Sequence, residues 1–346
     1  MSKLRARGEK IRLFILENVE AHPRDIGKIA SEHFNISRQA INVHLKYLTA
    51  KHSLIQTGKT RNCSYKPSPL LQWDNIYPVT PDLAEDIIWR NDILPRLNPM
   101  PDNVLKIWDY GFTEMFNNAI DHSDCTEIHV YIKKTPANTE ICISDNGVGI
   151  FKKIKDTFNL LDEKWAIFEL AKGKLTTDPF HHTGEGIFFS SRMFDEYSII
   201  SRGISFAHNF GDREDWIIEG NKHRNGTSVW MLLNNHTART TKKIFDQYTV
   251  GDDDYGFNKT VVPVKLAQYG NDELISRSQA KRLLARVELF QIVLLDFEGV
   301  TSIGQSFADE IFRVFVNEHP NISLFPINAN DRVKQMISRA ESVKLS

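Results

Sequence analysis

The sequence predicts a multidomain α+β protein, and three observations lead to this prediction. A chain of 346 residues is long enough for two or three domains. The formal net charge is −1, but the first 70 residues hold 13 Lys and Arg against 5 Asp and Glu. The rest of the chain holds 30 basic and 39 acidic residues, so a basic module precedes an acidic body. Segments with helical spacing alternate with strand-like segments along most of the chain.

The composition excludes several classes of protein. Hydrophobic residues make up 41% and charged residues 25%, which is ordinary for a soluble globular protein and unlike a disordered or collagen-like chain. No apolar run approaches the ~20 residues needed to cross a bilayer, and no apolar signal-peptide segment follows the basic N-terminus. The three cysteines are scattered and form no CxxC pair. We therefore expect a cytoplasmic protein without membrane association.

Residues 1–66 predict three short helices followed by a two-stranded hairpin. Apolar residues recur at helical spacing in residues 9–20 and again after Pro23, which suits the first turn of a helix. Ser37 is a candidate N-cap for the third helix. Residues 54–56 and 64–66 have the character of strands on either side of a polar tip.

The rest of the chain divides into a linker and two further regions. Residues 67–99 are predicted as a linker and a helix, because residues 66–81 contain four prolines and no clean periodicity. Residues 100–235 form a long α/β region. Strand and helix patterns alternate again in residues 258–346, which predicts a small α/β domain. Its predicted strands begin at Val261, Ile292 and Ile322, and its predicted helices are 277–290, 306–318 and 331–342.

Four segments of the middle region carry chemistry. Glu114 and Asn118 are four residues apart on a predicted helix and so share one face. A carboxylate there can orient or deprotonate a nucleophile, and an amide oxygen one turn later can bind Mg²⁺. Asp145 follows a strand and begins the run DNGVG, in which Gly147 and Gly149 let the backbone approach a ligand closely. The Asp145 carboxylate can accept a hydrogen bond from an exocyclic amine.

The third segment, around Gly184 and Gly186, opens an apolar helix, where backbone N–H groups can hold an anion. The fourth, around Thr227, enters another strand. Each segment alone is compatible with an ordinary turn or a solvated helix face. As a set, in this order, they resemble the GHKL ATPase superfamily, which includes gyrase, heat-shock chaperone ATPases, MutL and histidine kinases. The resemblance covers about residues 100–235.

The resemblance implies the Bergerat fold, an α/β sandwich that holds ATP and Mg²⁺ between helices and a mixed sheet. Residues 151–183 would form a mobile lid, and the Walker sequence GxxxxGK[ST] is absent. By the resemblance, Asn118 binds Mg²⁺, Asp145 contacts the adenine amine, Gly147 and Gly149 line the base pocket, Gly184 and Gly186 hold phosphates, and Thr227 supports the adenine side.

Glu114 distinguishes branches of this superfamily. Histidine kinases usually have Asn at this position, whereas Glu matches the branches in which it acts as a general base. These are the hydrolysing ATPases and the anti-sigma-factor serine kinases. None of the 12 histidines is followed by Glu or Asp, so the phospho-acceptor motif of a classical histidine kinase is also absent. Glu114 is therefore the candidate catalytic residue.

Residues 8–66 resemble a winged helix-turn-helix domain, whose third helix enters the DNA major groove. Residues exposed on that helix can contact base edges, and basic residues of the wing can contact phosphates. An alternative is that this basic module makes protein contacts. The candidate DNA-binding residues are Arg38, Gln39, Asn42 and Lys46 on the third helix, and Lys59 and Arg61 on the wing.

The C-terminal region, through about residue 342, resembles the STAS-like domains found fused to such ATPases. The resemblance is carried by LISRSQAKRLL, LLDFEGVTSIGQSFADEIFRVF and NISLFPINAN. It extends distantly to anti-sigma-factor antagonists, in which a serine at the start of a helix is phosphorylated. Ser306 occupies the comparable position, although the antagonists' Asp-Ser-Ser-Gly run is replaced here by GQSF. Ser306 is therefore either a helix N-cap or a phosphoacceptor.

The leading interpretation is an ATP-responsive DNA-binding regulator, in which ATP and Mg²⁺ bias the arrangement of the DNA-binding and STAS-like ends. Because Glu114 would permit slow hydrolysis or phosphotransfer, whether the protein is an enzyme stays open. One alternative is a serine kinase of the anti-sigma type, acting on its own or a partner's STAS-like domain. A scaffold with structural ATP is another. The partners considered are double-stranded DNA, a sigma-factor or STAS-type regulator, and a second copy in a homodimer.

Overall fold

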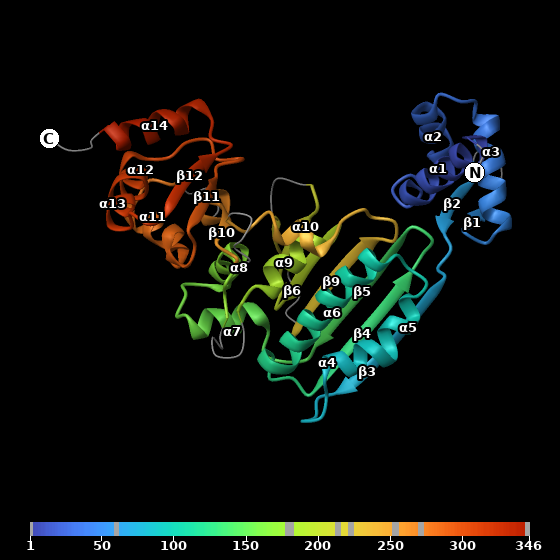
Figure 1. Ribbon diagram of the computed structural model, residues 1–346, viewed down its shortest axis with the longest axis horizontal. Coiled ribbons are helices and arrows are strands. Elements are labelled where there is room, and N and C mark those ends of the chain that lie inside the picture. Colours follow the sequence, from blue (N-terminus) through green and yellow to red (C-terminus); the bar gives the residue numbers. More distant parts are fainter. Residues whose placement is uncertain are drawn as a thin grey trace.

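The computed structural model describes residues 3–58, 62–176, 183–211, 216–220, 225–250, 256–268 and 273–342 (Figure 1). The protein has mixed α and β structure and is built on two separate hydrophobic cores. The smaller core lies within the N-terminal region, and the larger core extends from Tyr77 to Ala340. None of the described helices combines the length and the apolar composition needed to cross a membrane.

The N-terminal region contains the predicted three helices and hairpin. The Ser37 hydroxyl accepts a hydrogen bond from the Ala40 N–H at 3.2 Å, which confirms the predicted N-cap. The first helix begins at Lys3, whereas the prediction placed its start at residue 9. The predicted start is too late because the apolar pattern on which it depends begins only at Ile11. Pro23 precedes the second helix instead of lying in its first turn. The elements are α1 (Lys3–Asn18), α2 (Ile26–Phe34), α3 (Arg38–Ala50), β1 (Leu54–Thr57) and β2 (Ser64–Pro67).

A seven-stranded sheet forms the centre of the molecule, with the strand order β3-β4-β5-β9-β6-β7-β8. Every pairing among its described residues is antiparallel, so the mixed sheet implied by the family resemblance is wrong. Short connections such as those of β4 to β5 and β6 to β7 can join only antiparallel neighbours. The strands are β3 (Leu71–Pro78), β4 (Glu127–Lys134), β5 (Asn138–Asp145), β6 (Glu196–Ser201), β7 (Ile204–Asn209), β8 (Trp216–Glu219) and β9 (Thr227–Asn234).

Strand β3 lies inside the segment predicted as a linker. It pairs with β4 along its whole length, from Leu71 opposite Lys134 to Pro78 opposite Glu127. Prolines mark its approach and its end, and an edge strand tolerates a proline because one side of the strand needs no hydrogen-bond donor. Three short helical segments then lead to the long helix α6 (Asp102–His122). They are α4 (Glu85–Ile88), η2 (Trp89–Ile93) and α5 (Leu94–Leu97).

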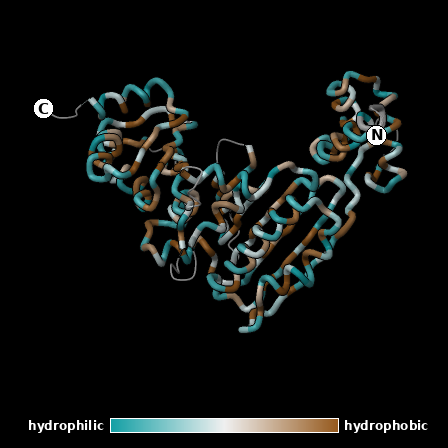
Figure 2. The backbone as a smooth tube through the Cα atoms, viewed as in Figure 1, coloured by the Kyte–Doolittle hydropathy of each residue, from teal (hydrophilic) through white to brown (hydrophobic). Residues whose placement is uncertain are grey.

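Helices cover one face of the sheet. Along β4, Ile128, Val130 and Ile132 alternate toward this face and are fully buried. Trp108 and Phe112 of α6 pack among them without solvent exposure. Figure 2 shows apolar residues in brown along the sheet and on the adjoining helices. The further helices of this region are α7 (Ile150–Thr157), α8 (Glu163–Lys172), α9 (Gly186–Met193) and α10 (Thr241–Phe245).

The C-terminal region is a three-stranded parallel sheet with helices, as the alternating pattern predicts. The segments α12, η5 and α13 follow one another without interruption, and the final helix has the predicted bounds. The elements are β10 (Lys259–Pro263), η3 (Val264–Ala267), α11 (Arg277–Leu284), η4 (Val287–Leu289), β11 (Ile292–Asp296), α12 (Gln305–Asp309), η5 (Glu310–Phe315), α13 (Val316–Glu318), β12 (Ser323–Ile327) and α14 (Asp331–Ser342).

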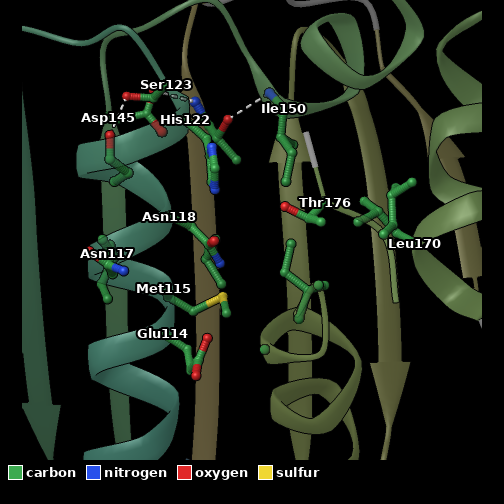
Figure 3. A pocket seen from close by; sticks show the side chains of 18 of the residues that line it. Glu114, Met115, Asn117, Asn118, His122, Ser123, Asp145, Ile150, Leu170 and Thr176 are labelled. Atoms are coloured by element: carbon green, nitrogen blue, oxygen red, sulfur yellow. Dashed lines mark hydrogen bonds between the residues drawn. The ribbon is translucent and has the colours of Figure 1, made fainter. Parts of the chain in front are cut away.

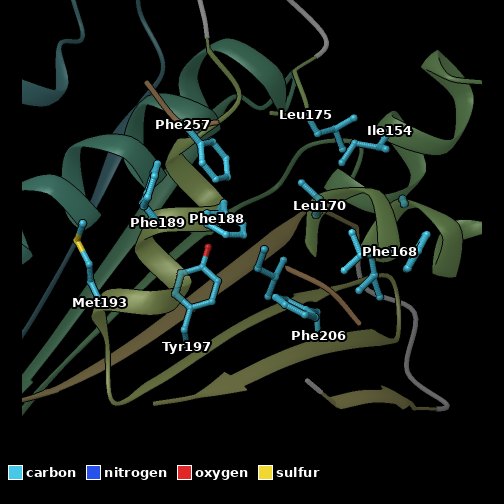
Figure 4. Close-up of a cluster of buried hydrophobic side chains, with 14 of the residues drawn as sticks. Ile154, Phe168, Leu170, Leu175, Phe188, Phe189, Met193, Tyr197, Phe206 and Phe257 are labelled. Carbon is cyan, nitrogen blue, oxygen red and sulfur yellow. The ribbon is translucent and has the colours of Figure 1, made fainter. Parts of the chain in front are cut away.

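The C-terminal and central regions share the larger hydrophobic core. Phe257, which precedes β10, packs against Phe188 and Phe189 of α9 with ring centroids 4.6 and 4.8 Å apart (Figure 4). Phe290 extends this contact to the C-terminal sheet, 5.1 Å from Phe257. The two regions are therefore joined by continuous apolar packing as well as by the chain.

Candidate functional site

A cavity of about 310 Å³ lies beside α6, with β5, β9, α7 and the end of α8 around it (Figure 3). It brings together residues from all four chemical segments of the sequence. Six of the eight candidate catalytic and nucleotide-binding residues line it: Glu114, Asn118, Asp145, Gly184, Gly186 and Thr227.

Helix α6 presents a polar face to the cavity. Glu114, Asn118 and His122 are spaced by four residues and point to the same side of the helix in Figure 3. On its other sides, α6 buries Phe112 and Phe116 in the core. The helix is therefore fixed by its apolar residues, and its polar residues are held at one wall of the cavity.

The Glu114 carboxylate lies against the first residue of α9. A Cβ atom added to Gly186 would overlap Glu114 Oε2, so a larger residue here would displace the Glu114 carboxylate. Burial raises the pKa of Tyr197, and the charge of Glu114 raises it further, so this phenol stays protonated. Tyr197 also contacts Met115 Sδ at 3.0 Å. The Glu114 carboxylate therefore lies at the cavity wall close to the start of α9.

Asp145 ties the ends of three segments together. Its Oδ1 atom accepts hydrogen bonds from the N–H groups of Gly147 at 2.8 Å and Thr227 at 3.2 Å. The Thr227 hydroxyl in turn accepts from the Ile150 N–H at 2.9 Å, which fixes the start of α7 (Figure 3). Burial raises the pKa of Asp145, and these hydrogen bonds partly offset that rise.

Gly147 and Gly149 do not line the cavity, unlike the other glycines proposed for nucleotide binding. A Cβ atom on Gly147 would overlap the Ser123 carbonyl oxygen at the end of α6. Gly149 has a φ of +89°, and a Cβ atom there would lie 2.6 Å from Ser201 Oγ. These glycines allow close packing of the loop that follows Asp145.

The segment compared with a lid contains two helices. Helices α7 and α8 account for most of residues 151–172. Leu175 and Thr176 continue the cavity wall, and Gly184 packs on the Leu175 backbone, where a Cβ atom would lie 2.5 Å from the carbonyl carbon. Residues 177–182 lie outside the described part of the chain.

Sequence reasoning missed several lining residues. His122 continues the helical spacing of Glu114 and Asn118, so the same periodicity could have found it. Lys153 also lines the cavity and pairs with Asp124 at 2.9 Å. The other missed residues share no short motif, and several are apolar: Met115, Ile143, Ile150, Ile154, Leu170, Leu175 and Val229.

The candidate DNA-binding residues of α3 share an exposed face. Arg38, Gln39, Asn42 and Lys46 are all exposed, while Ile41, Leu45 and Leu48 on the opposite side are buried. Val43 and Tyr47 add exposed apolar surface to this face. The Arg12 guanidinium lies 4.7 Å from the Tyr47 ring centroid and braces α3 against α1. Lys59 and Arg61 of the predicted wing lie outside the described residues.

Ser306 is exposed at the second position of α12. The N-cap of this helix is Gly304, so the interpretation of Ser306 as a cap is wrong. In Figure 1, α12 lies on the far side of the C-terminal region from α6.

Comparison with known families identifies one part of the chain. A family model described as a STAS-like domain of unknown function, DUF4325, matches residues 279–334. This range begins in α11 and ends in α14, so the C-terminal region is STAS-like. No curated protein matches the chain.

Proposed function

We propose that the protein is an ATP-binding regulator that couples ATP and Mg²⁺ in its central region to DNA binding by its N-terminal region and to its STAS-like region. The observation that carries this proposal is the convergence of Glu114, Asn118, Asp145 and Thr227 on one cavity. These residues come from four segments that are far apart in the sequence.

The residues of the cavity fit such a ligand. Asp145 has a carboxylate held by two backbone N–H groups, which suits recognition of an adenine amine beside the apolar wall of Ile150 and Val229. Asn118 would bind Mg²⁺, and the backbone at Gly186 begins a helix that favours negative charge. Bound ATP and Mg²⁺ would supply a transferable phosphoryl group. Glu114 would then orient the attacking nucleophile or accept its proton.

The N-terminal region supports the DNA-binding part of the proposal. Its three helices and hairpin have the order of a winged helix-turn-helix, and the polar face of α3 is exposed. Arg38 and Gln39 would contact base edges in the major groove. The net charge of +8 over residues 1–70 would add a salt-dependent attraction to phosphates.

The nucleotide proposal is tested by measuring the dissociation constant for ATP with Mg²⁺ by calorimetry. We expect Asp145→Asn and Asn118→Ala each to weaken binding by about tenfold or more, because each removes a contact to a charged or polar ligand group. Asp74→Asn is the matched control, since Asp74 is exposed on β3 and pairs with His129 away from the cavity. Wild-type protein without affinity for ATP would contradict the proposal.

The coupling is tested by titrating the protein with a pool of DNA duplexes, with and without ATP and Mg²⁺. Binding should depend on the nucleotide, and Arg38→Ala should cost about 1–3 kcal/mol of DNA-binding free energy. Equal DNA affinity in both conditions would rule out coupling even if both ligands bind.

A serine kinase activity is the second candidate, because Ser306 is exposed and does not serve as the N-cap. Mass spectrometry after incubation with ATP and Mg²⁺ should then find phosphoserine that Ser306→Ala removes, or phosphoserine on a copurified partner. Absence of phosphoserine from both would exclude this candidate.

A further inference from the structure

One short segment serves both the cavity and the C-terminal region. Residues 169–176 comprise the end of α8 and the chain that follows it. Leu170, Leu175 and Thr176 line the cavity. Glu169, Lys172 and Lys174 of the same segment make polar contacts to the STAS-like region or to one another. A displacement of this segment therefore changes both surfaces together.

The contact is built around a buried group of charges. Lys172 is 1% exposed, and its Nζ atom donates to Glu169 Oε1 at 2.8 Å and to the Ala285 carbonyl at 2.7 Å. Arg286 Nε lies 3.5 Å from Glu169 Oε2. Because Glu169 is itself 4% exposed, the loss of either partner leaves a charge away from water. Two of the partners of these buried charges, the Ala285 carbonyl and Arg286, come from the STAS-like region.

Further hydrogen bonds hold the backbone of the segment. Arg286 Nη2 donates to the Lys174 carbonyl, and the Thr260 hydroxyl donates to the Lys172 carbonyl at 2.6 Å. The Lys174 ammonium donates to the Leu289 carbonyl at 3.0 Å. These contacts fix the segment immediately before Leu175 and Thr176, which line the cavity.

We infer that Arg286 is a positioning residue for the cavity: the STAS-like region, acting through Arg286, holds the wall formed by Leu170, Leu175 and Thr176. The ligand's identity rests on the proposed function, but the positioning does not. A ligand that packs on this wall binds more tightly while the STAS-like region is docked, and by linkage it stabilises that docking equally. A protein partner that draws Arg286 away would weaken ligand binding.

The inference is tested by hydrogen–deuterium exchange on the full chain without ligand. Arg286→Ala should speed amide exchange in residues 170–176 and leave α1–α3 and β3–β4 unchanged. The control is Arg277→Ala, which removes an exposed arginine of the same region that pairs with Asp309. Arg286→Lys should restore slow exchange in part, because its ammonium can still reach the Glu169 carboxylate. A second variant, Thr260→Val, should give a smaller change in the same segment without removing a charge.

ATP titration of the same variants provides the second measurement. We expect Arg286→Ala to weaken ATP binding by about tenfold and Arg277→Ala to leave it unchanged. Unchanged exchange in residues 170–176 with Arg286→Ala would overturn the inference. Faster exchange in a protein that has no affinity for ATP would instead uphold the positioning role and overturn the nucleotide proposal.

Discussion

The N-terminal and C-terminal regions are attached to the central sheet in opposite ways. The N-terminal region has its own core and contacts the sheet through polar pairs at the surface. Glu17 accepts from Asn234 at 2.8 Å, and Glu20 lies 3.8 Å from Lys133. The STAS-like region shares a core with the sheet and adds the buried charges around Lys172. An exposed ion pair contributes ~0–1 kcal/mol to stability, whereas losing one partner of a buried ion pair costs about 3–5 kcal/mol.

Because of this difference, we expect the two terminal regions to be coupled to the cavity in different ways. The STAS-like region can influence the cavity through packed side chains without leaving its place. The described residues join the N-terminal region to the sheet through exposed polar pairs, so a ligand can change the orientation of this region at a lower cost in free energy. Figure 1 shows the two regions as separate lobes on either side of the sheet.

The largest expected effect comes from breaking the shared core. Phe257→Ala should lower the free energy of unfolding by about 3–5 kcal/mol, because it removes a buried ring packed between α9 and the C-terminal sheet. Denaturant unfolding measures this, with Phe325→Ala as control because that ring is 50% exposed. A separate, unshifted transition of the central region would mean that the two regions do not share a core.

Removing the buried Lys172 ammonium tests how much the buried charges contribute to the attachment of the STAS-like region. Lys172→Met should cost about 3 kcal/mol of unfolding free energy, since Glu169 would stay buried with one partner fewer. Lys242→Met is the matched control, because Lys242 is 78% exposed and its partner Asp246 is 54% exposed. Equal stability of the two variants would mean that the STAS-like region is held to the central region by apolar packing alone.

A substitution at Asp145 changes the cavity alone and leaves the contacts of the N-terminal and STAS-like regions intact. Burial raises the pKa of Asp145 in the folded state, so its charge costs stability at neutral pH. Asp145→Asn should therefore raise the melting temperature of the ligand-free protein at pH 7. The difference should shrink as the pH falls through the raised pKa, because wild-type Asp145 then takes up a proton. A lower melting temperature at pH 7 would mean that the hydrogen bonds to the charged carboxylate outweigh its burial.

The smallest effect is expected at the N-terminal attachment. A double-mutant cycle of Glu20→Ala and Lys133→Ala should give a coupling energy below about 1 kcal/mol, because Glu20 is 60% exposed. Small-angle scattering of the same variants should report a change in the position of the N-terminal region. A coupling of several kcal/mol would remove the contrast between the two attachments.

The sequence predicted the features that depend on local spacing. Glu114 and Asn118 share a face because α6 is a helix, and residues 331–342 form α14 because their apolar residues recur at helical spacing. Strand β3 was missed because its prolines resemble a linker and its pairing partner lies beyond α6. The roles of Gly147 and Arg286 depend on Ser123 and Glu169, which are distant in sequence, and no local pattern records such contacts.

The shared core also determines when the molecule can be completed during synthesis. The N-terminal core closes with residues up to Tyr65, so it can fold while the rest of the chain is still being made. The wall beside Leu175 is secured only after Arg286 and Leu289 have been translated. A ribosome adds ~5–20 residues per second, so the nascent chain carries a finished basic domain for roughly 10–45 s before its cavity is complete. The N-terminal region, which we propose binds DNA, is therefore the first region of this protein that can complete its folding.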